Sequence, residues 1–358
     1  MARLTDISWE AFEGLPLEAK RPYLENGAIP DTPYHTLFAQ QFDRGLLERL
    51  AALANRIRFM AKSKEGALYL KSLLPHKRAM LYFSQPSSRT FLSHLAACQI
   101  LGLTTGSVRD AATSSEFKGE SREDSIRTFS SYFDLIIMRT PEKGLAEHMA
   151  WELSNSSRPI PIINAGSGKD QHPTQALLDI YTLLRSFETK GGLHDRTVTF
   201  CGDLLRGRTV RSLSYLLTNF DNIRQVFVAP PQLQVPADVL EILDAKGVPY
   251  EVSDDLRAAV KASDAVYMTR IQDEWDQSKG ESARIDTHLF KFGAEELKLL
   301  PANGIIMHPL PRRDEITTCC DHDPRAMYWR QMRNGMWIRS ALIAMTFGFE
   351  KQIMCFGA

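Results

Sequence analysis

The sequence lacks the marks of several large protein classes. No apolar run approaches the roughly 18 residues that a membrane-spanning helix needs, and the amino terminus carries acids where a signal peptide has an apolar stretch. The five cysteines include no C-x-x-C pair, which argues against a zinc or thioredoxin-like site and fits reduced thiols. Basic and acidic residues balance at 43 each, so no overall field favours nucleic acid. We therefore expect a cytoplasmic protein that binds neither membrane nor nucleic acid.

Two common phosphate-binding signatures are missing as well. The segment 84–90 has neither the glycines nor the Gly-Lys-Ser/Thr ending of a Walker loop. The segment 202–209 lacks the G-x-G-x-x-G spacing of a dinucleotide turn, which argues against NAD binding. Any phosphate site must therefore be built from other residues.

Short apolar runs alternate with amphipathic, helical stretches along most of the chain. The runs, which we predict to be strands, are Ala79–Phe83, Leu135–Met138, Ile160–Asn164, Val198–Cys201, Gln225–Val228, Ala265–Met268 and Ile305–Met307. A helix is predicted after the N-cap residue Asp43, and others at Thr90–Ile100, Thr174–Phe187, Thr209–Asn219, Pro236–Ala245 and Asp323–Phe349. At 358 residues the chain suits two domains. This pattern predicts an α/β fold with two doubly wound parallel-sheet domains joined by long helices.

Residues 1–40 contain scattered prolines and glycines without steady periodicity, so we expect an extension that packs irregularly or stays mobile. The break between the domains is expected in the helix 173–188 or just after it, near Lys190-Gly191-Gly192.

The segment after the first predicted strand is suited to an anion. Ser87, Ser88, Arg89 and Thr90 open a helix, where free N–H groups and partial positive charge favour a phosphate. Hydroxyl groups can donate further bonds, and an arginine can bind two phosphate oxygens at once. The alternative is a serine cluster that caps the helix, with a solvent-facing arginine, and the motif alone does not decide between them.

Two further strands are followed by polar residues. Arg139 ends one predicted strand, where it either faces the crevice or lies in a surface turn. His172 precedes Pro173 at a helix start and can donate to a developing oxyanion, or it caps the helix. Gln175 offers an amide that can both accept and donate hydrogen bonds to a ligand.

In the second half of the chain, charged and polar residues again follow predicted strands. Arg208 begins a helix, where a cation is unfavourable unless a carboxylate offsets its charge, and Arg270 and Gln272 follow another strand. Two arginines at two strand ends suggest a dicarboxylic ligand. The prolines of His308–Arg313 fix that backbone, so its carbonyl groups either face a substrate or form a rigid turn between domains.

Taken in order, these segments resemble the aspartate/ornithine carbamoyltransferase family over about Leu46 to Phe349. The matching motifs are Ser-Ser-Arg-Thr at 87–90, Ser-Ser-x-x-Lys-Gly-Glu-Ser at 114–121, Met-Arg-x-Pro at 138–141, His-Pro-Thr-Gln-Ala-Leu-Leu-Asp at 172–179, Gly-Asp-Leu-x-x-Gly-Arg-Thr-Val at 202–210, Tyr-Met-Thr-Arg-x-Gln at 267–272 and His-Pro-Leu-Pro-Arg at 308–312. The last two look like the aspartate branch.

The resemblance implies three regions and a set of roles. They are an extension at 1–40, a carbamoyl-phosphate domain at 41–187 completed by a terminal helix at 328–349, and an aspartate domain at 188–327.

The resemblance also implies the role of each residue. The phosphate would be held by Ser87, Ser88, Arg89 and Thr90. The carbamoyl oxygen would be polarised by Thr90, Arg139 and His172, and the nitrogen would be oriented by Gln175 and the Leu310 carbonyl. Arg208, Arg270 and Gln272 would bind aspartate, and Ser114 and Lys118 would reach in from the adjacent subunit of a homotrimer. Arg89, Thr90, Arg139 and His172 form the catalytic set, and no metal or cofactor is required. The implied activity is aspartate carbamoyl transfer, an early step of pyrimidine synthesis.

Three positions depart from the family's pattern. Phe91 and Leu95 stand where the family has an arginine and a glutamate, and Trp275 stands where the aspartate branch has an arginine. The first two are either a compensated structural swap or the mark of a weak paralogue that serves as a binding or assembly subunit. Another amine acceptor also remains open. A regulatory or pathway-enzyme partner is compatible with either alternative.

Overall fold

The computed structural model describes residues 2–109, 119–168, 171–273, 285–286 and 288–357. The chain divides into two compact units, one made of Met1–Leu178 with Arg333–Ala358 and the other of Asp179–Met332. Both boundaries fall inside long helices, α8 (Pro173–Phe187) and α13 (Tyr328–Thr346). The first boundary therefore lies within the helix 173–188 rather than at its end, and residues 2–40 belong to the first unit.

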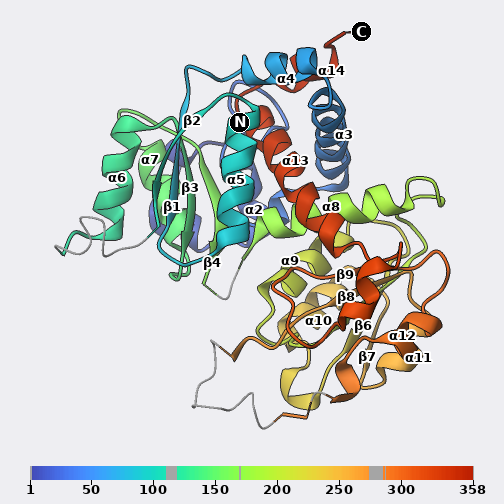
Figure 1. The fold of residues 1–358 in the computed structure, drawn as a ribbon. Coiled ribbons are helices and arrows are strands. Elements are labelled where there is room, and N and C mark those ends of the chain that lie inside the picture. The colour runs from blue at the N-terminus through green and yellow to red at the C-terminus, as the bar shows by residue number, and fades with distance from the viewer. Residues whose placement is uncertain (1, 110–118, 169–170, 274–284, 287, 358) are drawn as a thin grey trace. The chain divides into compact units, whose positions relative to one another are not determined.

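The first unit is built on a parallel sheet of four strands in the order β2-β1-β3-β4. These strands are β1 (Arg78–Phe83), β2 (Thr104–Val108), β3 (Leu135–Thr140) and β4 (Ile162–Ser167). Every residue of β3 and β4 is buried, as expected for strands covered on both faces. Met80, Tyr82, Ile136 and Met138 pack with α6 (Arg122–Tyr132) and α7 (Leu145–Ser154), and α5 (Ser88–Ile100) covers the opposite face (Figure 1).

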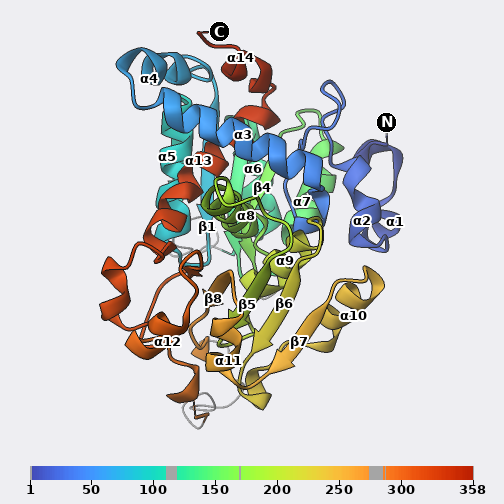
Figure 2. The ribbon, with the colours of Figure 1, turned by 90° about the vertical axis from the view of Figure 1, so that its right-hand side faces the viewer.

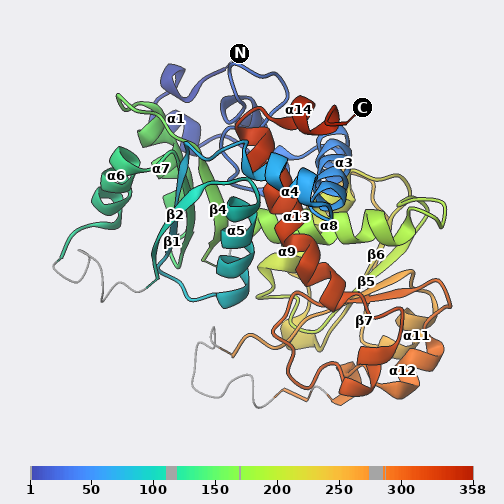
Figure 3. The same ribbon diagram turned by 45° about the horizontal axis from the view of Figure 1, so that its top comes forward.

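The remaining helices of this unit are α3 (Arg44–Met60), α4 (Lys64–Lys71) and α14 (Glu350–Met354). The predicted N-cap of α3 is confirmed, because the Asp43 side chain accepts a hydrogen bond from the Leu46 N–H at 2.8 Å. Figure 3 shows α14 beside α3, where Arg49 binds the Glu350 carboxylate through two nitrogens at 3.1 and 2.6 Å.

The extension packs against this unit, as the first of the two alternatives expects. It contains α1 (Trp9–Glu13) and α2 (Leu17–Lys20), which lie beside α7 in Figure 2. The Trp151 indole donates to the Ile7 carbonyl at 2.9 Å, and Lys20 pairs with Glu147 at 2.7 Å. Thr36 forms a parallel bridge with Ile163 and so covers the outer edge of β4, the last strand of the sheet.

The second unit has a parallel sheet of five strands in the order β7-β6-β5-β8-β9. They are β5 (Thr197–Cys201), β6 (Arg224–Val228), β7 (Tyr250–Ser253), β8 (Ala265–Met268) and β9 (Ile305–Met307). Its helices are α9 (Arg208–Leu217), α10 (Ala237–Ala245), α11 (Leu256–Lys261) and α12 (Ala294–Leu299). Figure 2 shows α11 and α12 together on one side of this sheet, where Leu256 and Val260 pack against Val226 and Val266.

Each of the seven predicted strands overlaps a strand of the structure, and among the described residues two further strands were missed. The missed strands, β2 and β7, are sheet edges without a buried residue, so they lack the apolar run on which the prediction relied. The last long helix begins at Tyr328 rather than at Asp323. The reason is that Ala326 pairs with Ile306 and the Met327 N–H donates to the Ile306 carbonyl at 2.8 Å, which holds this backbone against β9.

Candidate functional site

Each sheet has one point at which the strand order reverses, between β1 and β3 in the first unit and between β5 and β8 in the second. Ligands of open parallel sheets bind outside the carboxyl ends of the strands at such points. The predicted residues of both halves of the chain follow these four strands or neighbours of them. Each unit therefore carries its own candidate binding site.

In the first unit, the side chain of the N-cap residue of α5 does not cap the helix. Ser87 is the N-cap residue with extended backbone, and its side chain makes no capping hydrogen bond. The first-turn N–H groups thus keep their capacity to bind a ligand. Arg89 is half-buried rather than facing solvent, and Thr90 is buried. The capping alternative is therefore not what the structure has.

The loop after β1 is attached to the end of β3. Phe83 lies beside Arg139 in the parallel register, and the Gln85 N–H donates to the Arg139 carbonyl at 3.2 Å. This bond brings the serine-rich loop and the predicted arginine to one edge of the sheet.

Arg139 and His172 lie together beneath that edge. Arg139 is only 8% exposed, so it is not a surface arginine in a turn. Its Nη1 donates to the Ala165 carbonyl at 3.2 Å and lies 3.5 Å from Nε2 of His172. Because a guanidinium can only donate, this contact favours the imidazole with its proton on Nδ1. Gln175 follows in the first turn of α8, with its N–H bonded to the His172 carbonyl at 3.0 Å.

Gly166 makes the contact between Arg139 and His172 possible. A Cβ atom at this position would lie 2.8 Å from Nη1 of Arg139 and 3.4 Å from Cδ2 of His172. The residue also has φ +120°, a conformation that side chains disfavour. Asn164 shapes the same turn, because its Oδ1 accepts from the Gly166 N–H at 2.8 Å. Sequence reasoning missed both residues, although a glycine two residues beyond the predicted strand Ile160–Asn164 was a usable signal.

Arg339 of α13 connects the two helices that carry these motifs. It is 3% exposed, and its guanidinium donates to the Ser93 hydroxyl of α5 at 2.6 Å and to the Thr174 hydroxyl of α8 at 3.3 Å. His94 lies nearby, and its Nδ1 donates to the Thr90 carbonyl at 2.8 Å. Burial, with help from the charges of Arg339 and Arg139, holds the pKa of His94 well below its usual range, so the ring is neutral.

The departure at Phe91 is accommodated in the core. Phe91 is 6% exposed and meets the ring of Phe83 edge-on, with centroids 5.4 Å apart and planes 89° apart. This is a favoured aromatic geometry. Phe91 is therefore a packed structural residue, which favours the compensated swap over a disturbed phosphate loop.

In the second unit, Asp203 joins the loops after β5 and β8. Its fully buried carboxylate accepts from the Arg206 N–H at 3.1 Å through one oxygen and from the Gln272 N–H at 3.0 Å through the other. Gly202 allows the close approach, since a Cβ there would lie 2.1 Å from the Thr269 carbonyl oxygen. Sequence reasoning assigned neither residue a role. These contacts hold the segments of Arg208 and Gln272 together.

The predicted cations of this unit are partly exposed, as a ligand site requires. Arg208 is the first residue of α9, and Arg270 lies two residues after the end of β8. Nη1 of Arg270 donates to the Ile271 carbonyl at 2.8 Å and lies 3.8 Å from the Asp273 carboxylate. Asp273 also binds Arg313 through two bonds of 2.9 Å. The loops after β8 and β9 are thereby linked.

Leu310 has a left-handed backbone with φ +57°, and its peptide bond to Pro311 is cis. Its N–H donates to Nδ1 of His308 at 2.7 Å, and Nε2 of His308 lies 2.6 Å from the Glu315 carboxylate. Arg312 pairs with Asp321. These contacts hold the loop from within the second unit, which fits a fixed carbonyl at Leu310.

Three residues named from the sequence, Ser114, Lys118 and Trp275, lie outside the described residues. Within the part of the chain that the structure describes, no group of three or more metal-ligating side chains is suited to a metal, and no helix is long and apolar enough to cross a bilayer.

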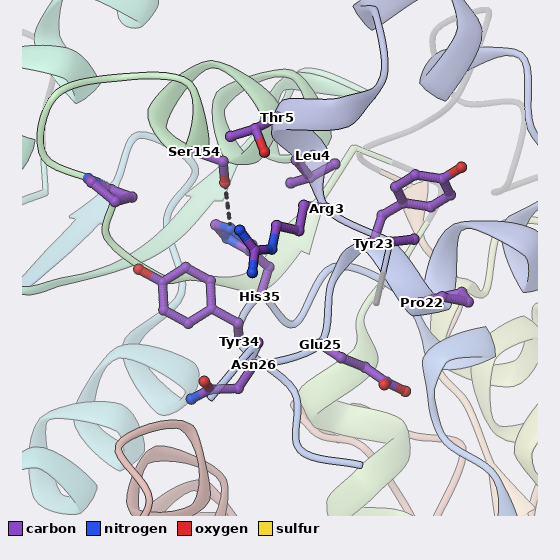
Figure 4. Close-up of a pocket in the computed structure, with 13 residues that line it drawn as sticks. Arg3, Leu4, Thr5, Pro22, Tyr23, Glu25, Asn26, Tyr34, His35 and Ser154 are labelled. Atoms are coloured by element: carbon purple, nitrogen blue, oxygen red, sulfur yellow. Dashed lines mark hydrogen bonds between the residues drawn. The ribbon is translucent and has the colours of Figure 1, made fainter. Parts of the chain in front are cut away.

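A separate cavity of about 270 Å³ lies under the extension in the first unit (Figure 4). Nδ1 of His35 accepts from the Ile162 N–H at 3.1 Å, and its Nε2 donates to the Ser154 hydroxyl at 3.0 Å. Burial lowers the pKa of His35 to about 3. The ring is thus a neutral structural bridge, and none of the predicted site residues lines this cavity.

Comparison with known proteins gives two family matches that together span most of the chain. Residues 34–185 match the carbamoyl-phosphate-binding domain of aspartate/ornithine carbamoyltransferases, and residues 194–346 match their aspartate/ornithine-binding domain.

Individual relatives are similar over most of their length. A chloroplastic aspartate carbamoyltransferase of Oryza sativa is 41% identical over 310 residues, which is 85% of this chain and 82% of the relative. The catalytic subunit of the Vibrio cholerae enzyme is 41% identical over 313 residues, 87% of this chain and 96% of the relative. A crystal structure of Trypanosoma cruzi aspartate transcarbamoylase with carbamoyl phosphate and aspartate superposes with a TM-score of 0.75 at 36% identity, covering 86% of this chain and 95% of that one.

Proposed function

The chain belongs to the aspartate/ornithine carbamoyltransferase family, and from this premise we propose that it transfers the carbamoyl group of carbamoyl phosphate to L-aspartate. The observation that carries the proposal is the buried pair of Arg139 and His172 beside the open start of α5. This arrangement combines an anion site with donors for a developing oxyanion. The product would be N-carbamoyl-L-aspartate, which supplies pyrimidine synthesis.

The proposed roles in donor binding follow from the positions of the side chains. Ser87, Ser88, Arg89 and Thr90 receive the phosphate at the first turn of α5. Arg139, His172 and the Thr90 hydroxyl donate to the carbamoyl oxygen as negative charge develops on it, and each such donor contributes about 3–4 kcal/mol to stabilisation of the transition state. The Gln175 amide and the Leu310 carbonyl orient the carbamoyl nitrogen.

The acceptor is assigned to the second unit. Arg208 and Arg270 offer two separate cations for the two carboxylates of aspartate, and Gln272 is fixed beside them through Asp203. The neutral amine of aspartate attacks the carbamoyl carbon, so that a C–N bond forms, the C–O bond to phosphate breaks and the amine loses a proton. Positioning and oxyanion stabilisation account for the rate, without a covalent enzyme intermediate.

The test is production of carbamoyl aspartate by the purified protein at saturating carbamoyl phosphate and aspartate, with ornithine as a second acceptor. We expect turnover with aspartate only, and its loss in Arg89→Ala. Arg78→Ala is the control, because Arg78 begins β1, at the end of the strand opposite to the loop that leads to Arg89. Product from ornithine would assign another acceptor, and the absence of product from both would support the binding subunit.

Two further features belong to this proposal. A homotrimer, in which Ser114 and Lys118 of a neighbouring subunit complete the site, is supported by the sequence match to the family alone. A cytoplasmic location is supported by the five free thiols, which suit a reducing compartment. Sedimentation of the purified protein and imaging of a tagged chain in its own cells test these two points.

A further inference from the structure

Arg109 is a charged residue that the roles above leave unassigned. It follows directly after β2, and its guanidinium carbon lies 4.4 Å from the centre of the Phe91 ring. The distance is well inside the range of a cation–π contact. Phe91 in turn lies next to Thr90 in the first turn of α5. A permanent positive charge is therefore placed over the side chain that follows the proposed phosphate loop.

The sheet explains why the two residues meet. β2 pairs with β1 in parallel, with Tyr82 beside Val108, so the segments that follow both strands leave the sheet at the same edge. The planes of the Phe91 and Phe83 rings are perpendicular, and the guanidinium of Arg109 lies over the Phe91 ring. Phe91 is buried and Arg109 is exposed. The ring thus works as a fixed platform, and the cation on it keeps access to solvent and to an entering ligand.

We propose that Arg109, held on Phe91, is an additional recognition residue for the phosphate group of the donor. The inference rests on the proposed function, because it assumes that a phosphate binds at the start of α5. At position 91 the family's phrase carries an arginine, and here a guanidinium lies over the side chain of that position from the segment that follows β2. In this chain the positive charge near the phosphate loop would then come from Arg109, after β2, instead of from residue 91 in α5.

A purely structural contact would have a different signature. If Arg109 only covered the Phe91 ring, its removal would lower stability and leave the affinity for phosphate unchanged. If it attracts phosphate, its removal weakens binding most at low salt, where the screening length is about 30 Å at 0.01 M against about 10 Å at 0.1 M. Affinity and salt dependence therefore distinguish the two roles.

The experiment uses the full-length protein, with inorganic phosphate as the probe, titrated by calorimetry at 0.01 M and 0.1 M salt. Arg109→Gln is expected to raise the Kd for phosphate about threefold to tenfold at the lower salt, and less at the higher. Arg109→Lys, which keeps the charge, should recover part of the affinity. Arg127→Gln is the matched control, an exposed arginine of α6 in the same unit.

Phe91→Leu tests the platform, because leucine keeps an apolar side chain and offers no ring face. Like Arg109→Gln, this variant should bind phosphate more weakly than wild type, and the double variant should bind no more weakly than Arg109→Gln alone.

An unchanged Kd and salt dependence in Arg109→Gln would overturn the inference. If wild-type protein binds phosphate and Arg89→Ala does not, only the role of Arg109 fails. If neither binds, the proposed function fails with it.

Discussion

Nη1 of Arg139 lies 3.5 Å from Nε2 of His172, although the two residues belong to different segments of the chain. Neither position by itself distinguishes a ligand-binding residue from a surface arginine or a capping histidine. The structure does, because it buries both side chains and places them within 3.5 Å of each other, which excludes a surface arginine. The contact depends on a third residue, Gly166, which leaves the space between them open.

We expect Gly166→Ala to abolish most of the activity. The new methyl group would lie 2.8 Å from Nη1 of Arg139, and an alanine at φ +120° is strained. Displacing this donor should lower kcat/KM by about 100-fold or more, and the strain should lower the free energy of unfolding by about 1–3 kcal/mol. Initial rates and urea unfolding measure the two effects.

The matched control for this variant is Gly27→Ala. A Cβ at Gly27 meets nothing within 4 Å, so the same substitution should leave rate and stability close to those of the wild type. Wild-type kcat/KM in Gly166→Ala would show that the contact between Arg139 and His172 has no part in the reaction.

Arg339→Met should impair the reaction although Arg339 is assigned no contact with a substrate. Methionine fills the space but donates no hydrogen bond, so Ser93 of α5 and Thr174 of α8 would lose their common donor. We expect the KM for carbamoyl phosphate to rise about tenfold, and the free energy of unfolding to fall by about 2–4 kcal/mol.

The comparison variant for Arg339→Met is Arg333→Met, an exposed position on the same helix. Arg339→Lys, which keeps the charge and some donor capacity, should recover part of the affinity for carbamoyl phosphate. A fall in stability with no change in this KM would mean that Arg339 supports the core only.

Much of the fold was predictable because its central strands are short, continuous apolar runs. Val198–Cys201 and Ala265–Met268, for example, are buried on both faces and stand out from their surroundings. The edge strands do not. Thr104–Val108 contains small and polar residues, and no residue of Tyr250–Ser253 is buried. Their strand conformation is set by hydrogen bonds to a neighbouring strand, which a local pattern does not record.

The site residues also include some that the sequence predicts and some that it does not. Arginines that follow strands, such as Arg139 and Arg270, were predictable because the topology of a parallel sheet gives those positions their meaning. Gly166, Asp203 and Arg339 were not, because each acts between segments that are distant in the sequence. A buried carboxylate that joins two loops looks, in the sequence, like any aspartate in a turn.

Asp203→Asn should affect the acceptor and spare the donor. The carboxylate accepts from the Arg206 and Gln272 N–H groups through separate oxygens, and an asparagine can serve only one of them. We expect the KM for aspartate to rise about tenfold to a hundredfold, because losing a charged hydrogen bond costs about 1.5–3 kcal/mol. The KM for carbamoyl phosphate should stay within about twofold of wild type.

The control variant is Asp238→Asn, on the exposed surface of the same unit. An equal rise in both KM values would contradict a role confined to the acceptor loops.

The buried His35 should make the protein sensitive to mild acid. Burial lowers the pKa of His35 to about 3, whereas in the unfolded chain a histidine titrates near its ordinary value of about 6.5. Between these values the unfolded state binds the extra proton, so this contribution to stability is fully present above about pH 6.5 and is lost as the pH falls towards 3. From pH 7 to pH 5 the contribution of His35 to the free energy of unfolding falls by about 2 kcal/mol.

Urea unfolding of wild type and His35→Gln at both pH values isolates this contribution, because the other titrating groups are common to the two proteins. His35→Gln should be less stable at pH 7, since a glutamine cannot reproduce both ring bonds, yet lose about 2 kcal/mol less on acidification. Equal losses in the two proteins would show that His35 accepts a proton within the folded state.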